Sequence, residues 1–241
     1  MRKSALCAFG LVVAILVALG FLLIRSHPAD VGLSPYGSWD SVEHRGYDDH
    51  GRTLQQKHWL LLLPMLLCTG AFTSVGYSHL TVLARGEGFA PQTIALAITI
   101  SGLTLMASKF TYGFVEEKLS AYATNWIFGG ILTAGLLLCC VTGGSTARLY
   151  IAMIVYGFGL PLGTVGITTW AGDLASPEQF DMTVRRFQAG YAAGALVFSS
   201  LPGILADRFD GSYVPAYLFF AVCAVFAVNV IQWMYRNTDK G

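Results

Sequence analysis

The sequence predicts an all-α membrane protein with seven transmembrane helices. Of its 241 residues, 54% are hydrophobic and only 12% are charged, whereas an average soluble domain carries about 25% charged residues. The hydrophobic residues gather in seven long blocks without the alternation that barrel strands show. Because only helices and closed barrels satisfy their backbone groups in hydrocarbon, the blocks indicate a helical bundle.

Each block is long enough to cross a bilayer, since a hydrocarbon core of about 30 Å needs about 20 helical residues. The first block, 5–24, is followed by Arg25, Ser26, His27 and Pro28. This is not a small-residue cleavage site, so we interpret the block as a retained helix and not a signal peptide. The other blocks follow one another closely: 58–84, 91–115, 122–143, 148–171, 184–206 and 213–235.

These blocks divide the chain into four predicted parts. Residues 1–24 form a transmembrane helix, 25–57 a polar linker, 58–235 a six-helix domain and 236–241 a tail. Local signals agree with the helix starts: Pro91 follows Ala90 at the start of a block, and Ser120 and Ser145 precede the next two as candidate N-caps. Before the sixth block, residues 176–179 (Ser-Pro-Glu-Gln) form a capping box.

Small residues and prolines predict how the helices pack and bend. Two pairs of glycines lie four residues apart, the spacing that lets helices approach closely in a membrane: Gly159 with Gly163, and Gly190 with Gly194. Three prolines inside the blocks remove backbone hydrogen bonds and predict local kinks: Pro64, Pro161 and Pro202.

The distribution of Lys and Arg predicts the orientation. More of them fall on the side of the linker and the C-terminus than on the opposite side. The positive-inside rule therefore places the linker and the C-terminus in the cytoplasm, with the bundle in the plasma (inner) membrane. Arg2 and Lys3 would then lie outside, directly before the first helix. We expect from this conflict that five further helices once preceded residue 1.

Three segments resemble the major facilitator superfamily of transporters. Residues 28–37 resemble the stretch that follows the sixth helix of these proteins and opens their central cytoplasmic loop. Residues 109–119 are similar to the short loop between helices eight and nine, with Glu117 in place of the usual Asp and Lys118 in place of the Arg. Residues 203–213 resemble the junction of helices eleven and twelve.

The resemblance covers the whole chain as family helices six to twelve, so the last six helices would form one six-helix half-bundle. It implies partners: a lipid bilayer, a missing N-terminal transporter half and a small-molecule substrate. The charged turn would act as a conformational latch, with Gly113 allowing close helix approach and charged residues bridging helix ends: Glu116, Glu117 and Lys118. Asp181 and Arg185, four residues apart, are expected to pair as a further part of this latch.

Ionisable groups inside a membrane are costly, so each is a candidate site residue. Lys109 lies about one and a half turns inside the end of its block. It occupies a position that is often a basic, anion-binding residue in the monocarboxylate and oxalate–formate branches of the family. His79, beside Tyr77, could bind substrate or carry protons. Gln188 is the fourth substrate-binding or coupling candidate. Further polar side chains could face a cavity: Tyr191, Asn125, Tyr156, Trp170 and Asn229.

Other function classes lack their motifs. The formal net charge of +1 gives no indication of nucleic-acid binding. No catalytic residues, cofactor or metal site are expected, because the nucleophile and metalloprotease motifs are missing and the linker histidines have no ligand spacing. The sequence therefore predicts secondary active transport of a small solute, an organic anion such as a monocarboxylate, by alternating access, with residues 1–241 inactive alone. The alternative is a seven-helix receptor-like or other non-transport membrane protein.

Overall fold

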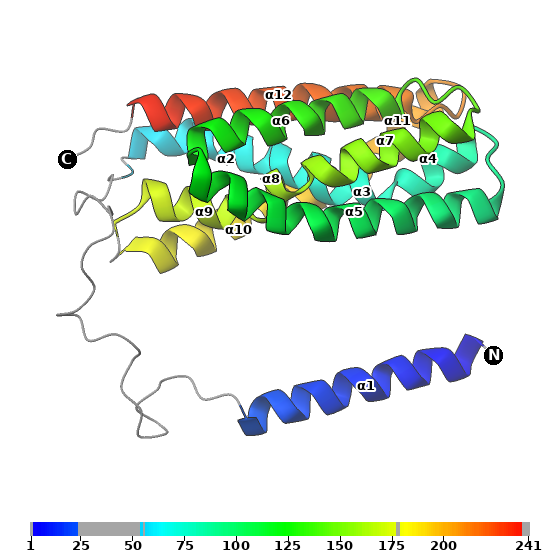
Figure 1. The fold of residues 1–241 in the computed structure, drawn as a ribbon, viewed down its shortest axis with the longest axis horizontal. Coiled ribbons are helices and arrows are strands. Elements are labelled where there is room, and N and C mark those ends of the chain that lie inside the picture. Colours follow the sequence, from blue (N-terminus) through cyan, green and yellow to red (C-terminus); the bar gives the residue numbers. More distant parts are fainter. Residues whose placement is uncertain (1, 24–53, 55, 177–178, 238–241) are drawn as a thin grey trace. The chain divides into compact units, whose positions relative to one another are not determined.

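A computed structural model describes residues 2–23, 54, 56–176 and 179–237 of the chain (Figure 1). Every regular element in these ranges is helical, and the described residues contain no strand. The chain divides into two compact units, Met1–Asp49 and His50–Gly241, and each is described by itself. The all-α fold class predicted from the sequence is confirmed.

The first unit contains α1, Arg2–Leu23, a helix of 22 residues. It agrees with the helix predicted over 5–24. Its described side chains, those of Gly10–Gly20, form an apolar stretch, and the large ones are exposed, as Leu11 and Leu16 show. The linker's histidines, residues 28–37 and most of the region 25–57 lie outside the described residues.

The second unit contains six helical segments that are long and apolar enough to cross a membrane. They agree with the six closely spaced blocks of the sequence and are Gln56–Ser78, Pro91–Lys118, Ala121–Cys139, Thr146–Leu174, Phe180–Arg208 and Val214–Asn237. Three of these spans are single helices: α5 (Pro91–Lys118), α6 (Ala121–Cys139) and α12 (Val214–Asn237).

The other three spans are interrupted. The first consists of α2 (Gln56–Gly70), the π-helix η2 (Ala71–Val75) and α3 (Gly76–Ser78), and α4 (Leu80–Gly86) follows it. The fourth consists of α7 (Thr146–Gly159), α8 (Pro161–Thr164) and α9 (Gly166–Leu174). The fifth consists of α10 (Phe180–Val197) and α11 (Leu201–Arg208).

The interruptions follow the local chemistry of the chain. Pro161 and Pro202 lie in the first turns of α8 and α11, where a missing backbone N–H is tolerated, and each follows a break in its span. Pro64 instead lies inside α2, and the wider turn of η2 begins seven residues after it. The kinks predicted at Pro161 and Pro202 are thus present as interruptions of the helix.

The predicted helix starts agree with the structure at most positions. Pro91 is the first residue of α5, and the Ser120 hydroxyl accepts a hydrogen bond of 3.2 Å from the backbone N–H of Ala123. Ser145 occupies the N-cap of α7 but makes no side-chain capping bond. The capping box at 176–179 includes two residues outside the described part of the chain.

One boundary prediction is wrong. The third block was expected to end at 115, within the segment 109–119 that resembles a family loop, but α5 continues as a helix to Lys118. The segment contains good helix formers such as Glu116, Glu117 and Lys118, and a single Gly113 costs a helix only about 1 kcal/mol. Leu119 and Ser120 alone connect α5 to α6.

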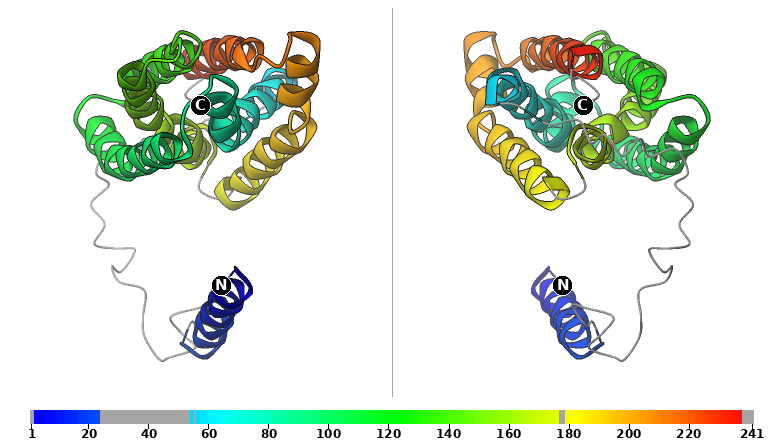
Figure 2. Two further views of the ribbon diagram at one scale, coloured as in Figure 1. Left: turned by 90° about the vertical axis from the view of Figure 1, so that its right-hand side faces the viewer. Right: turned by 90° about the vertical axis from the view of Figure 1, so that its left-hand side faces the viewer.

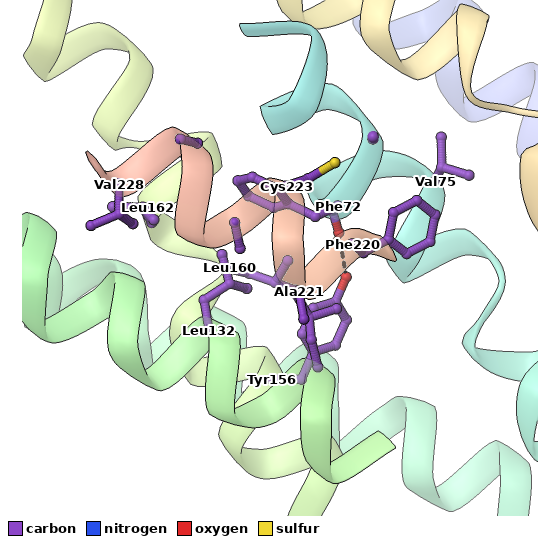
Figure 3. Close-up of a cluster of buried hydrophobic side chains, with 14 of the residues drawn as sticks. Phe72, Val75, Leu132, Tyr156, Leu160, Leu162, Phe220, Ala221, Cys223 and Val228 are labelled. Atoms are coloured by element: carbon purple, nitrogen blue, oxygen red, sulfur yellow. Dashed lines mark hydrogen bonds between the residues drawn. The ribbon is translucent and has the colours of Figure 1, made fainter. Parts of the chain in front are cut away.

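The helices of the second unit form a bundle with two unlike sides. Figures 1 and 2 show α6 and α12 along one side and α5 and α10 along the opposite side. Helix α7 packs against both α5 and α6, whereas α2 packs against α10 and α12. Between these helices lies an apolar core that includes Phe72, Tyr156 and Phe220 (Figure 3), where the Tyr156 hydroxyl donates a 2.5 Å hydrogen bond to the carbonyl of Phe72.

Glycines stand where helices of this core approach most closely. A Cβ at Gly159 would lie 2.5 Å from the backbone nitrogen of Leu132, and one at Gly190 would lie 3.0 Å from the Leu66 side chain. Added Cβ atoms at Gly163 and Gly194 would overlap Thr73 and the Leu67 backbone. Gly113 differs, because a Cβ there would meet no atom within 4 Å. The close helix approach expected at Gly113 is therefore not made within the described bundle.

Candidate functional site

The candidate site lies on the side of the bundle formed by α5 and α10. The spans that contain these helices are the least buried of the six. In the apolar 18-residue stretch of each span, only 22% of the residues are buried for Pro91–Lys118 and for Phe180–Arg208, against 61% for Thr146–Leu174. The segment η2–α3 contacts both helices, because η2 packs against α10 and Tyr77 of α3 lies beside Gly102 of α5. We call the exposed sides of α5 and α10, together with η2–α3, the open face.

A stripe of residues seven apart runs along α5 beside the open face. Gly102, Lys109 and Glu116 share one side of the helix, because seven residues are nearly two full turns. At one end of the stripe, a Cβ on Gly102 would lie 3.6 Å from the hydroxyl of Tyr77 in α3. At the other end, the Thr169 hydroxyl of α9 donates a 3.3 Å hydrogen bond to the Glu116 carboxylate. The stripe therefore follows the flank of α5 that turns toward α3 and α9.

Lys109 lies in the middle of this stripe, and its side chain is exposed. Because α5 continues to Lys118, Lys109 is nine residues, about two and a half turns, from the end of the helix. This is deeper than the one and a half turns predicted from the sequence. A cation at that depth is costly unless it meets water, an anion or a protein partner. The role of Lys109 as a site residue stays a prediction.

Helix α10 forms the other border of the open face. Its packed side contacts α2, where Phe187 meets Trp59 ring to ring with centroids 5.8 Å apart. Tyr191 is half-buried, and α10 contacts η2. Gln188, one turn before Tyr191, is exposed. Gln188 and Tyr191 thus follow one flank of α10.

The charged residues at the start of α10 lie apart from this polar flank. Asp181 and Arg185 are both exposed in the first turns of the helix. Arg186 places its guanidinium 5.5 Å from the centre of the Trp59 ring, an arrangement that anchors the cation to the bundle surface. An exposed ion pair would contribute at most about 1 kcal/mol, and the role of Asp181 and Arg185 as a latch stays a prediction.

His79 is held by its own turn. It joins α3 to α4, and its Nδ1 lies 3.0 Å from the Val75 carbonyl and 3.2 Å from the Ser78 hydroxyl. Its ring is half-buried. Tyr77 faces α5 at Gly102, whereas His79 turns back on the backbone of η2. Tyr77 therefore lies beside the α5 stripe that contains Lys109, whereas the His79 ring hydrogen-bonds only to residues of its own turn among those described.

A buried polar network occupies the end of the bundle where α5 and α9 end and α6 begins. The Asn125 side-chain carbonyl accepts a 2.8 Å hydrogen bond from the Trp170 indole and a 3.4 Å bond from the Tyr112 hydroxyl. All three residues are fully buried. Asn125 and Trp170 were expected to be able to face a cavity, but they hydrogen-bond to each other in the core. Tyr156, a further candidate of this kind, is also in the core and donates its hydrogen bond to the carbonyl of Phe72.

Acidic residues extend this network toward its rim. Glu116 meets Thr169, and Asp173 of α9 accepts a 2.5 Å hydrogen bond from the Tyr235 hydroxyl of α12. Among the predicted latch residues, Glu116 thus contacts a second helix. Glu117 is exposed, and Lys118 lies with its ammonium 5.9 Å from the Phe114 ring centre in its own helix. Sequence reasoning missed Thr169, Asp173 and Tyr235; the only signal was an acid at the end of an apolar block.

The family assignment agrees with this architecture. The sequence profile of the Major Facilitator Superfamily matches residues 59–241. The chain belongs to the Major Facilitator Superfamily. A comparison with curated proteins finds no match.

Membership in the Major Facilitator Superfamily has direct consequences. Its members are secondary transporters and not enzymes, so this chain is transport machinery for a solute that the match does not specify. Together with the six candidate spans, it makes the protein an integral membrane protein in contact with a lipid bilayer. The matched range begins in α2 and includes all six spans of the second unit almost completely. The segment 28–37 lies outside it.

Proposed function

We propose that this superfamily member is one half of a secondary active transporter for a small organic anion such as a monocarboxylate, working by alternating access. The observation that supports the anion is Lys109, an exposed cation deep in a transmembrane helix. It lies between Tyr77 and Glu116 along one flank of α5. The ammonium would attract a carboxylate.

The open face would meet a second six-helix half. Hydrocarbon is a poor environment for Lys109 and Gln188, which are exposed within spans. A substrate site near the midplane between two halves would satisfy both side chains. In this proposal the chain is divided as predicted: helix 1–24, linker 25–57, six-helix domain 58–235 and tail 236–241. The linker and the tail face the cytoplasm, and the membrane is the plasma (inner) membrane.

Uptake into proteoliposomes tests the need for a second half. The purified chain alone should accumulate no radiolabelled monocarboxylate above empty vesicles, because a single half provides only one wall of the site. Robust uptake by the purified chain would contradict this expectation.

Substitution of Lys109 tests the choice of anion. In a transporter that pairs this chain with a second half, Lys109→Ala should reduce monocarboxylate uptake at least about tenfold, and Lys109→Arg should retain more of it. Arg148→Ala is the matched control, since Arg148 is an exposed cation in the first turn of α7. Unchanged anion uptake in Lys109→Ala would exclude the anion proposal and leave the assignment as a transporter intact. No described feature favours the receptor-like alternative.

A further inference from the structure

A groove lies on the side of the second unit away from the open face. It is formed by α2, α6 and the C-terminal half of α12 and has a volume of about 430 Å³. Its walls include partly exposed large apolar side chains: Leu61, Trp126, Phe226 and Trp233. None of the polar side chains assigned to the open face contributes to it.

The length of the groove matches one leaflet of a bilayer. Its lining on α12 runs from Phe226 to Arg236, and the ten steps between these two residues rise about 15 Å along the helix. A hydrocarbon core of about 30 Å has leaflets of about half that depth. Arg236 is one residue from the end of α12, so the groove runs from the membrane surface to near the midplane.

A fixed cation stands at the surface end of the groove. The Arg236 guanidinium lies 5.4 Å from the ring centre of Tyr122 and donates a hydrogen bond to the Tyr122 hydroxyl. An arginine has five N–H donors in a planar fork suited to phosphate. Tyr122 holds the fork in place by one of them. Among the described residues that line the groove, none is acidic, so the mouth of the groove carries a positive charge.

A second polar group lies in the wall beside this cation. Gln232 is 3% exposed, and its amide nitrogen donates a 2.8 Å hydrogen bond to the Tyr122 carbonyl. Its side-chain oxygen is buried and has no hydrogen-bond partner among the described residues. A buried acceptor without a donor is costly. A ligand that brings hydroxyl donors to the wall of the groove would relieve this cost.

We infer that the groove between α2, α6 and α12 binds one anionic phospholipid, with its phosphate at Arg236 and an acyl chain along Phe226 and Leu61. Trp126 and Trp233 flank the region between head group and chain, where aromatic side chains are favoured. A phosphatidylglycerol head group combines the required negative charge with hydroxyl donors for Gln232. The site is separate from the open face and does not depend on which solute is transported.

Native mass spectrometry of the full chain tests this site. The protein is incubated with equal amounts of phosphatidylglycerol and phosphatidylcholine of the same acyl chains. Phosphatidylglycerol adducts should exceed phosphatidylcholine adducts about tenfold, because the choline cation of phosphatidylcholine offsets the phosphate charge that attracts Arg236. Arg236→Gln should bring the ratio close to one, whereas Arg236→Lys should keep part of the preference.

Two further variants keep the test specific. Arg148→Gln removes an exposed cation that does not line the groove and should leave the ratio as in the wild type. Leu61→Trp fills the apolar part of the groove and should reduce adducts of both lipids. An unchanged ratio in Arg236→Gln, an equal loss in Arg148→Gln, or displacement of the lipid by inorganic phosphate at matched concentration would each overturn the inference. Circular dichroism confirms that each variant keeps its helices.

Discussion

The two sides of the six-helix unit differ in how they treat polar groups. In the packed region, Asn125, Trp170 and Tyr112 are fully buried and bond to one another. On the open face, Lys109 and Gln188 are exposed although they also lie within apolar spans. The packed region therefore uses polar groups to fix one arrangement of helices, whereas the open face leaves them available to a ligand or a second half.

The largest effect on stability is expected from Asn125→Leu. The substitution removes the oxygen that accepts hydrogen bonds from the Trp170 indole and the Tyr112 hydroxyl. Both donors would then be buried without this acceptor. The expected loss is about 2–4 kcal/mol in the free energy of unfolding, measured by titration with SDS in mixed micelles. Asn229→Leu is the control, because Asn229 is exposed and its amide bonds only to its own helix at Val225. Equal losses in both variants would remove the distinction between the two sides.

A pair of glycines on α6 sharpens the comparison within one helix. At Gly135 an added Cβ would lie 2.5 Å from the Tyr156 backbone, while at Gly130 it would meet no atom within 4 Å. Gly135→Ala should lower the free energy of unfolding by about 1–3 kcal/mol through overpacking. Gly130→Ala should be neutral or stabilising by up to about 1 kcal/mol, since alanine favours helix. If both variants shift the free energy of unfolding in the same direction, the close approach of Tyr156 does not decide which residue is tolerated at Gly135.

Gly113→Ala extends the comparison to the open face. Gly113 is exposed in the interior of α5 and has open space around it. The substitution should stabilise the isolated chain by about 0.5–1 kcal/mol because alanine raises helix propensity. If the glycine allows a second half to approach, the same variant should lower uptake in a paired transporter. A destabilised isolated chain would show instead that Gly113 has a packing role within this half.

The smallest effect on stability is expected from Lys109→Ala. The exposed side chain makes no contact that the bundle requires, so the free energy of unfolding of the isolated chain should change by less than about 0.5 kcal/mol. Thermal denaturation in detergent measures this change, with Lys118→Ala as a control at the end of the same helix. A large loss of stability would show that Lys109 has a packing role. A reduced uptake in Lys109→Ala could then not be attributed to lost substrate binding.

The sequence predicted the helices better than their interior details. Hydropathy placed all six spans because their lengths follow from the thickness of the bilayer, and Ala90, Pro91 and Ser120 marked two starts correctly. It did not predict the π-helix Ala71–Val75, which follows Pro64 without a distinct composition. It also ended α5 too early, because charged residues were taken as a sign of a loop although Glu and Lys are good helix formers.

For the candidate site, the sequence predicted Lys109, Tyr77 and Gln188 as site residues but not their surroundings. The seven-residue spacing of Gly102, Lys109 and Glu116 was present in the sequence. Its meaning became clear only when Tyr77 and Thr169 were found at either end of the stripe. Asp173 and Tyr235 belong to different helices, so no local pattern connects them.

By itself, the sequence determined that this protein is a helical membrane bundle, because apolar length and backbone hydrogen bonding leave few alternatives in hydrocarbon. Only the tertiary structure decided which polar groups satisfy one another. Asn125 and Gln188 are similar amides in apolar spans, yet one is fully buried and the other exposed. Their difference comes from which helix lies beside each of them, and such contacts join residues far apart in the chain.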